Sequence, residues 1–569
     1  MGLTSASVEQ QYYIGLAVVA LLTSGLFIWY HHCNYGPSGA DLPLPPGPRK
    51  LPLIGNVLDM PATNPHITFA RWGKQFDSDI LHLNVLGVDY IVLNSYEAII
   101  DLLDKRSGIY SSRPHFTMLQ DLIGWEGDLL FLSWGKALNA HKKLFHQEFH
   151  PSNSAIHRPH EKKALSQFLN NLIDTPEEWG NHLKQMIGAI IIGVAYGVQV
   201  QPMDDPNIDA AAKMYSVLNR VLIPGAFLVD TLPILKYIPS WFPGASFKQQ
   251  AKAWYGIRKK TIMPPFVQVK QAMMTGTAED SFTLRCLAND KDIVDPCLDH
   301  LSAEEEMIMQ TAGTLYEGGA DTGNTALRSF ILAMMCFPDA QQHAQEELDC
   351  VIGEERLPDY GDLDMGVGLG TDLEHVSLPY VCALVMECFR WQTVAPLAIP
   401  HLVDAEDTYK GYYIPKGATV LPNIWAILRD EKRYGPTVDT FDPRRWLLQR
   451  RNDDSNDISS TGAVGGTRGE SQWTLNPEMI IHNPIPMSFG FGRRVCPGKH
   501  MALSTFQINV VSLLHCFDIT PPVDGDGNQV MPEIKYVTRL TSGPAPYKCS
   551  IKPRSEKHVV LVQQMLIDE

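Results

Sequence analysis

Several signatures of other protein classes are missing from this chain of 569 residues. It has no Cys/His spacing typical of a zinc site and no Gly-rich fingerprint for a flavin or nicotinamide. Its net charge of −16 argues against nucleic acid as a partner, because phosphate backbones attract basic surfaces. No Gly/Ser linker or long run of like charges divides the chain, so we expect one large globular body.

Clustered cysteines and glycosylation signals are missing as well. Small secreted scaffolds pair closely spaced cysteines, whereas a reducing compartment keeps thiols free. The ten cysteines here are scattered, at positions 33, 286, 297, 336, 350, 382, 388, 496, 516 and 549. No Asn-x-Ser/Thr sequon occurs. Both features favour a protein body that does not face the secretory lumen.

Charged residues are absent from residues 10–40, and residues 12–30 are almost wholly apolar with aromatic residues at both ends. A helix of this length spans about 28 Å, close to the thickness of the endoplasmic reticulum bilayer. We predict a short tail over 1–11 and a transmembrane signal-anchor helix over 12–30. A cleaved signal peptide is the alternative, but residues 1–11 lack its basic region. Arg49 and Lys50 place the following body in the cytosol, as a single-pass protein of the endoplasmic reticulum membrane.

A proline-rich segment follows the predicted anchor. Residues 42–56 contain five prolines, which restrict φ and remove backbone donors. We predict a stiff extended hinge over 31–56, without helix or ladder hydrogen bonds. A proline-rich ligand for a partner protein is the alternative. The remaining body would cover 57–569.

The body reads as mainly α with small β-sheets. Residues 80–93 and 409–420 alternate apolar and polar side chains, which predicts strands. A long helix is predicted over 303–335, and it contains Gly318-Gly319-Ala320-Asp321-Thr322. Two adjacent glycines cost about 1 kcal/mol each relative to Ala in a helix interior. We therefore expect the backbone to widen or kink there to let a ligand approach, although a harmless glycine pair is the simpler alternative.

The segment Phe489–Gly498 encloses a single cysteine in a glycine-rich loop. Gly490, Gly492 and Gly498 permit positive φ and close approach to a flat ligand. Backbone N–H groups and Arg494 are expected to favour the thiolate of Cys496, which then serves as a metal ligand. A lone cysteine is otherwise more often a buried core residue.

Another motif places Glu387 and Arg390 on one helical face, at i and i+3, with apolar neighbours. Most such pairs are solvated, but this one is expected to be partly buried and to need a further partner. Arg445, in the segment 441–446, is the candidate.

These motifs, in this order, resemble the cytochrome P-450 family of membrane-anchored eukaryotic type, and the chain is similar to fungal members of specialised metabolism. The resemblance implies the P-450 fold, with haem b between the long helix and the cysteine loop. It makes Cys496 the axial thiolate ligand of the haem iron. It also makes Glu387, Arg390 and Arg445 a structural triad, with Arg444 standing where the family has Glu.

The resemblance also assigns site residues. Asp321 is expected to relay protons and Thr322 to hydrogen-bond dioxygen or an ordered water. The early helix departs from the family's Trp-x-x-x-Arg pair, because Leu138 stands at the Trp and Lys142 at the Arg. Lys lacks a bidentate fork, so this propionate contact is expected to be weakened. The expected haem-binding residues are Phe489, Gly490, Arg494, Cys496, Gly498, His401 and Lys142.

The implied activity is insertion of one oxygen atom of O₂ into a hydrophobic small molecule. Electrons would come from NADPH through a separate cytochrome reductase, with cytochrome b5 as an optional donor, since the chain has no flavin site. The alternatives are a haem-thiolate isomerase or peroxide-using enzyme, and a membrane-tethered haem or ligand binder without turnover.

The reductase is predicted to dock over basic residues near Cys496, namely Lys142, Lys143, Arg444, Arg493 and Lys499. The substrate pocket is predicted to be lined by residues 115–130, 222–229, 397–399 and 541–543, which include Phe116, Trp125 and Phe227. Polar surface insertions are predicted over 449–480 and 364–371.

Overall fold

The computed structural model describes residues 42–223, 225–288, 301–363, 376–450 and 471–567. The tail over 1–11, the anchor over 12–30 and the insertion over 364–371 lie outside these residues. Within them, no helix combines the length and the apolar character needed to cross a bilayer.

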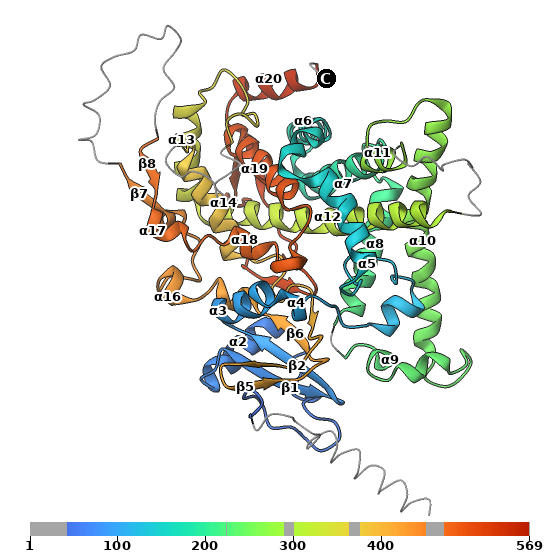
Figure 1. Cartoon of the computed structure of the whole chain (residues 1–569). Helices are drawn as coiled ribbons and strands as arrows, with labels where there is room; N and C mark the ends of the chain where they lie inside the picture. The colour runs from blue at the N-terminus through green and yellow to red at the C-terminus, as the bar shows by residue number, and fades with distance from the viewer. Residues whose placement is uncertain (1–41, 224, 289–300, 364–375, 451–470, 568–569) are drawn as a thin grey trace, which may run out of the picture.

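The fold is mainly helical with small sheets, as the sequence predicts (Figure 1). The helices are α2 Pro65–Gln75, α3 Tyr96–Ile99, α4 Ser107–Tyr110, α5 Lys136–Phe149, α6 Arg158–Asp174, α7 Trp179–Tyr196, α8 Pro206–Val221, α9 Leu228–Thr231, α10 Ser246–Thr275, α11 Phe282–Ala288, α12 Ala303–Cys336, α13 Pro338–Val351, α14 Pro379–Trp391, α15 Ile424–Ile427, α16 Glu431–Tyr434, α17 Pro477–Ile480, α18 Ile485–Ser488, α19 Lys499–Cys516 and α20 Glu556–Met565.

The strands form one four-stranded sheet and several two-stranded ladders. The order in the larger sheet is β1-β2-β6-β3; β2 and β6 are parallel, and the other pairs are antiparallel. The two-stranded ladders are β4-β5, β7-β8, β10-β11 and β12-β9. The strands are β1 Ile80–Val85, β2 Val88–Leu93, β3 His401–Leu402, β4 Asp407–Tyr409, β5 Tyr412–Ile414, β6 Thr419–Pro422, β7 Leu447–Gln449, β8 Trp473–Leu475, β9 Phe517–Thr520, β10 Tyr536–Thr538, β11 Ser542–Pro544 and β12 Ser550–Pro553.

The long helix α12 crosses the whole body (Figure 1). Its start is fixed by a capping box, in which the Ser302 side chain accepts from the Glu305 N–H and the Glu305 carboxylate accepts from the Ser302 N–H. Three acidic residues in the first turn further stabilise the helix start, because their negative charges lie near the positive end of the helix dipole. The helix packs against α7 on one side and α19 on another, so it forms the axis on which the other elements are arranged.

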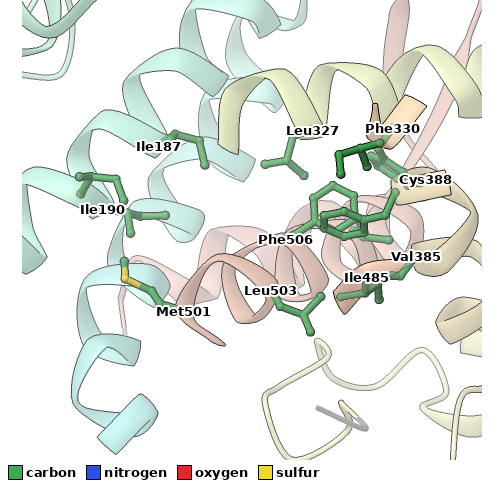
Figure 2. Close-up of a cluster of buried hydrophobic side chains, with 14 of the residues drawn as sticks. Ile187, Ile190, Leu327, Phe330, Val385, Cys388, Ile485, Met501, Leu503 and Phe506 are labelled. Atoms are coloured by element: carbon green, nitrogen blue, oxygen red, sulfur yellow. The ribbon is translucent and has the colours of Figure 1, made fainter. Parts of the chain in front are cut away.

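Apolar side chains from α7, α12, α14 and α19 meet in one core (Figure 2). Phe330 of α12 meets Phe506 of α19 edge to face, with ring centroids 6.4 Å apart. Phe506 also contacts Phe389 of α14 at 5.1 Å, and Phe389 in turn contacts Phe489 at 5.7 Å. Such aromatic pairs add to the stabilisation from area burial. This chain of rings ties the start of the cysteine loop to the central helices.

The described part of the proline-rich hinge packs on the sheet instead of standing free. Pro46 O accepts from the His82 N–H of β1 at 3.0 Å, and Pro43 O accepts from the Tyr413 N–H of β5 at 2.8 Å. The expectation of no ladder-type hydrogen bonds was therefore wrong for 42–56. Proline lacks a backbone donor, but its carbonyl is a full acceptor that an edge strand can use.

Part of the surface insertion predicted over 449–480 packs on the body in the structure. Its ends form the β7-β8 ladder, and the Ser471 hydroxyl donates to the buried Glu347 carboxylate. Trp473 packs against Tyr380 with ring centroids 5.7 Å apart. Residues 471–480 thus belong to the packed body, while 451–470 lie outside the described residues. The aromatic side chain at 473 buries area that a polar composition alone does not reveal.

Candidate active site

Glu387, Arg390 and Arg445 meet in the interior. Arg390 donates to both Glu387 oxygens, Nε to Oε2 at 2.8 Å and one terminal nitrogen to Oε1 at 2.7 Å. Arg445 Nε lies 3.0 and 3.1 Å from the same two oxygens. Glu387 and Arg390 are fully buried, and Arg390 also donates to the Leu428 and Val438 carbonyls. This bidentate arrangement locks α14 to the chain around 428–445.

Further donors complete the Glu387 site. Trp446 Nε1 donates to Oε2 at 3.0 Å, and the Asp442 N–H donates to Oε1 at 3.0 Å. Arg444, which stands where the family has Glu, turns outward and pairs with Asp442 at 2.8 Å. The departure at 444 therefore leaves the buried triad intact.

The cysteine loop is a tight turn stabilised by its own backbone. Cys496 N–H donates to the Phe489 carbonyl at 2.7 Å, while Gly490 and Gly492 have φ of 85° and 54°. A Cβ at Gly492 would lie 2.2 Å from the Leu103 carbonyl oxygen, so the loop packs tightly against the helical segment Ile100–Lys105. Gly498 has φ of −88°, so the expected positive φ was wrong there. Position 498 is instead open, with no atom near its missing Cβ.

The electrostatics of Cys496 differ from the sequence expectation. Burial raises the pKa of the thiol, whereas the Gly498 N–H and the Lys499 charge lower it. Arg494 does not act on the sulfur. Its Nε donates to the Ser111 carbonyl at 2.6 Å, and its terminal nitrogens donate to the carbonyls of Leu129 and Leu132. Stabilisation of the thiolate thus needs a positive partner such as a metal ion.

The middle of α12 borders open space within an otherwise buried helix. Residues 318–324 are all half-exposed, although residues 311–317 before them are buried. Nothing lies within 4 Å of a Cβ at Gly318, whereas a Cβ at Gly319 would be 2.7 Å from Ile191 of α7. The two glycines therefore serve different ends: one opens the interior and the other lets two helices approach.

The glycine pair does not interrupt α12, which is continuous from Ala303 to Cys336. The Thr322 hydroxyl donates to the Gly318 carbonyl one turn earlier at 2.9 Å. This bond stays within the regular helix, and it leaves the lone pairs of Oγ1 as acceptors. Close helix packing against Ile191 accounts for Gly319, whereas Gly318 faces open space.

Asp321 lies beside Thr322 but has partners on other elements. The Thr541 hydroxyl donates to its Oδ2 at 3.1 Å. Burial raises the pKa of the Asp321 carboxyl, partly offset by hydrogen bonds from Thr541, Tyr215 and Thr325. The carboxyl is therefore able to hold a proton more readily than a solvated aspartate.

Buried basic side chains lie near Arg494 of the cysteine loop. His401 of β3 is buried, and its Nδ1 lies 2.7 Å from the Tyr110 carbonyl. Because a carbonyl only accepts, Nδ1 carries the proton and Nε2 is left for another partner. Burial and the nearby charges of Arg113 and Arg494 lower the pKa of His401.

Arg113 is a member of this cluster that sequence reasoning missed. It is buried and donates to the Ile399 and Pro400 carbonyls, both at 2.8 Å. Among the described residues no carboxylate pairs with Arg113 or Arg494. No spacing marks Arg113, because these partners lie 286 and 287 residues further along the chain.

The early helix α5 directs Lys142, the expected propionate contact, to the backbone of the cysteine loop. Leu138 is buried, and Lys142 Nζ donates to the Arg493 carbonyl at 2.9 Å.

The aromatic residues expected to line the substrate pocket differ in burial. Trp125 is fully buried and donates from Nε1 to Glu317 at 2.8 Å. Phe116 and Phe227 are only partly buried.

A flat iron porphyrin with two carboxylates fits these residues. Open space beside Gly318 can receive a planar group, a half-buried thiol lies in the glycine-rich loop, and the guanidinium groups of Arg113 and Arg494 have no carboxylate within ion-pair distance among the described residues, which suits an anion. These features define the haem-thiolate class.

Comparison with known proteins gives the same answer. The Cytochrome P450 family profile matches residues 45–549. Cytochrome P450 monooxygenase 98 of Postia placenta is 39% identical, covering 91% of this chain and 92% of its own. Cytochrome P450 monooxygenase ple1 of Rhodocybe pseudopiperita is 36% identical (90% and 90%), and tryptamine 4-monooxygenase of Psilocybe cyanescens 38% (90% and 94%). The chain belongs to the cytochrome P450 family, and it is a haem-thiolate monooxygenase that uses haem b.

Proposed function

We propose that this monooxygenase hydroxylates, or similarly oxidises, a hydrophobic metabolite in fungal specialised metabolism. The observation that carries the proposal is the combination of a glycine-rich cysteine loop, open space beside Gly318 and the guanidinium groups of Arg113 and Arg494, which no carboxylate of the described residues pairs. The names of the relatives support this setting, since one is a tryptamine 4-monooxygenase. Bound haem would supply activation of O₂ at the thiolate-ligated iron.

Arg113 and Arg494 would hold the haem carboxylates, and His401 would join them once a carboxylate beside its Nε2 favours the protonated ring. Arg113, Arg494 and His401 approach one region from three segments, and each is anchored by backbone carbonyls. That anchoring fixes their positions before an anion arrives, which lowers the entropic cost of binding. Cys496 would be the axial ligand, and Phe489, Gly490 and Gly498 would give the porphyrin close access to the loop.

Thr322 and Asp321 would take part in proton delivery, Thr322 by binding a water and Asp321 by exchanging protons. Thr322 Oγ1 points its proton at the Gly318 carbonyl, so it can accept a hydrogen bond from a water in the open space. Asp321, one residue earlier, would exchange protons through its hydroxyl partner Thr541. A peroxide-using enzyme or isomerase would not need this pair.

NADPH-cytochrome reductase would be the electron donor, with cytochrome b5 as a second one, docking over the cysteine loop. Lys143 and Arg493 are exposed beside the loop, and Lys499 is half-exposed. Arg444 is already paired with Asp442, and Lys142 is bonded to a carbonyl, so both should matter less. Charge reversal at Lys143 is expected to slow reduction and to reduce its salt dependence. Unchanged reduction kinetics would contradict this docking site.

A single-pass endoplasmic reticulum protein with a cytosolic body fits the exposed apolar side chains between α8 and α10. Ile234, Tyr237 and Trp241 are 71%, 73% and 78% exposed, and Phe242 is 50% exposed. This segment lies at the same end of the molecule as β1 and β5 (Figure 1). Contiguous exposed apolar groups favour a lipid surface, and the charge-free residues 12–30 would anchor it. Carbonate extraction and protease protection of the full chain test this topology.

The test of the function starts with the full-length protein and a reductase. We expect a thiolate-type Soret band for the reduced carbon monoxide complex, lost in Cys496→Ala. NADPH-dependent turnover of a panel of terpenoid, polyketide and indole substrates should follow. A thiolate band with turnover only on peroxide, or with no turnover, would instead favour one of the two alternatives stated above.

A further inference from the structure

The contact between α5 and the cysteine loop differs from a propionate site. Lys142 Nζ donates to the Arg493 carbonyl at 2.9 Å, three residues before Cys496. Leu138, one turn earlier on α5, is buried and offers no donor. The ammonium of Lys142 is therefore directed to the backbone of the loop.

The side chain of the same loop residue is held by a second group. Arg493 Cζ lies 4.5 Å from the centroid of the Trp134 ring, a cation–π geometry. The backbone of Trp134 is fixed, since its amide N–H donates to Ser112 Oγ at 3.3 Å, and the Ser112 hydroxyl donates to Asp404 at 2.8 Å. Lys142 and Trp134 thus hold Arg493 by its carbonyl and its guanidinium. We name Lys142, Trp134 and Arg493 the Arg493 clamp.

Neighbouring loop residues are held by other elements. Gly492 is pressed against the Leu103 carbonyl, and Arg494 donates to Ser111. Residue 493 is the point where α5 acts on the loop. Beyond it, the Cys496 N–H is bonded within the loop to Phe489. A displacement at 493 therefore reaches the cysteine through two intervening residues.

We propose that the Arg493 clamp positions Cys496, and that Lys142 acts on the loop in place of the haem carboxylates. Lys142 is a positioning residue, and the carboxylate charge is left to Arg113, Arg494 and His401. The inference rests on the proposed haem-thiolate site. It explains how the chain tolerates Leu138 and Lys142: a compact ammonium suits a single carbonyl, whereas a guanidinium fork suits a carboxylate.

The test compares Lys142→Met with Lys142→Arg, Trp134→Leu and the control Lys136→Met, an exposed cation on the same helix. Two quantities are measured on each full-length holoenzyme. One is the conversion of the reduced carbon monoxide complex from the thiolate to the thiol form as pH falls. The other is the rate of haem transfer to apomyoglobin. If Lys142→Met fails to fold, Trp134→Leu tests the second arm of the clamp independently.

The clamp predicts that Lys142→Met and Trp134→Leu convert to the thiol form on the order of tenfold more readily, the worth of one charge-assisted hydrogen bond. Haem transfer should stay near the wild-type rate, and Lys136→Met should resemble wild type in both measurements. Lys142→Arg should lose part of the thiolate stability, because a guanidinium fork suits a carboxylate better than the single Arg493 carbonyl. Faster haem transfer with an unchanged thiolate would overturn the clamp in favour of a carboxylate contact. Wild-type behaviour of both variants would also overturn it. A wild-type protein without any thiolate band would instead refute the proposed function itself.

Discussion

Replacing Glu387 with glutamine should destabilise the protein strongly, although the change is nearly isosteric. Each carboxylate oxygen faces three donors: Oε1 receives Arg390, Arg445 and the Asp442 N–H, and Oε2 receives Arg390, Arg445 and Trp446. In glutamine one oxygen becomes an NH₂ group, so three donors on that side lose their acceptor. Two arginines also lose the charge that compensates them in a buried site.

The magnitude follows from that geometry. Removing one partner of a buried ion pair costs about 3–5 kcal/mol, a large part of the roughly 5–15 kcal/mol that stabilises a folded domain. The matched control is Arg444→Ala, one residue from Arg445. Its exposed pair with Asp442 should be worth about 0–1 kcal/mol.

Two measurements check this prediction on the same preparations. The midpoint of urea unfolding followed by tryptophan fluorescence should fall for Glu387→Gln and stay unchanged for Arg444→Ala. The half-life of the haem absorbance at a fixed elevated temperature should shorten in the same order. If Glu387→Gln unfolds like the control, then the buried triad contributes no more than a surface pair and the reasoning is wrong.

The other predictions concern protons. Thr322→Ala should lower the product formed per NADPH consumed, while Thr322→Ser, which keeps the hydroxyl, should preserve it; equal coupling in both variants would contradict the role of Oγ1. Burial and the nearby Asp128 raise the pKa of Glu317 from its ordinary value of 4.5 to about 8. Between these two pH values the carboxyl is protonated in the folded state and ionised in the unfolded state. Its contribution to stability is therefore lost as pH rises from 4.5 to 8, and Glu317→Gln should flatten unfolding midpoints over that range. Burial lowers the pKa of His515 from 6.5 to about 4, so stability is full above 6.5 and falls as the pH drops toward 4. His515→Leu should remove up to about 3 kcal/mol of that acid sensitivity, and an unchanged slope in acid unfolding would count against it.

Local patterns predicted much of the architecture. The alternation over 80–93 predicted strand structure where β1 and β2 lie, and the helix predicted over 303–335 matches α12 to within one residue. These signals succeed because capping and periodicity act between residues a few positions apart. The packing role of Gly319 could not be predicted in this way. It depends on the approach of Ile191 from α7, which no local pattern encodes.

The sequence by itself determined the class of this protein. The motifs around Thr322, Glu387 and Cys496 each consist of residues close together in the chain, so both the motifs and their order can be recognised without the structure. Only the tertiary structure decided where the cations act. Arg494 turns from the sulfur to Ser111, Lys142 binds a loop carbonyl, and Arg113 joins His401 across the fold. The physical reason is that the direction of a long charged side chain depends on which acceptors the folded chain brings within reach. Here those acceptors lie some 290 to 380 residues away.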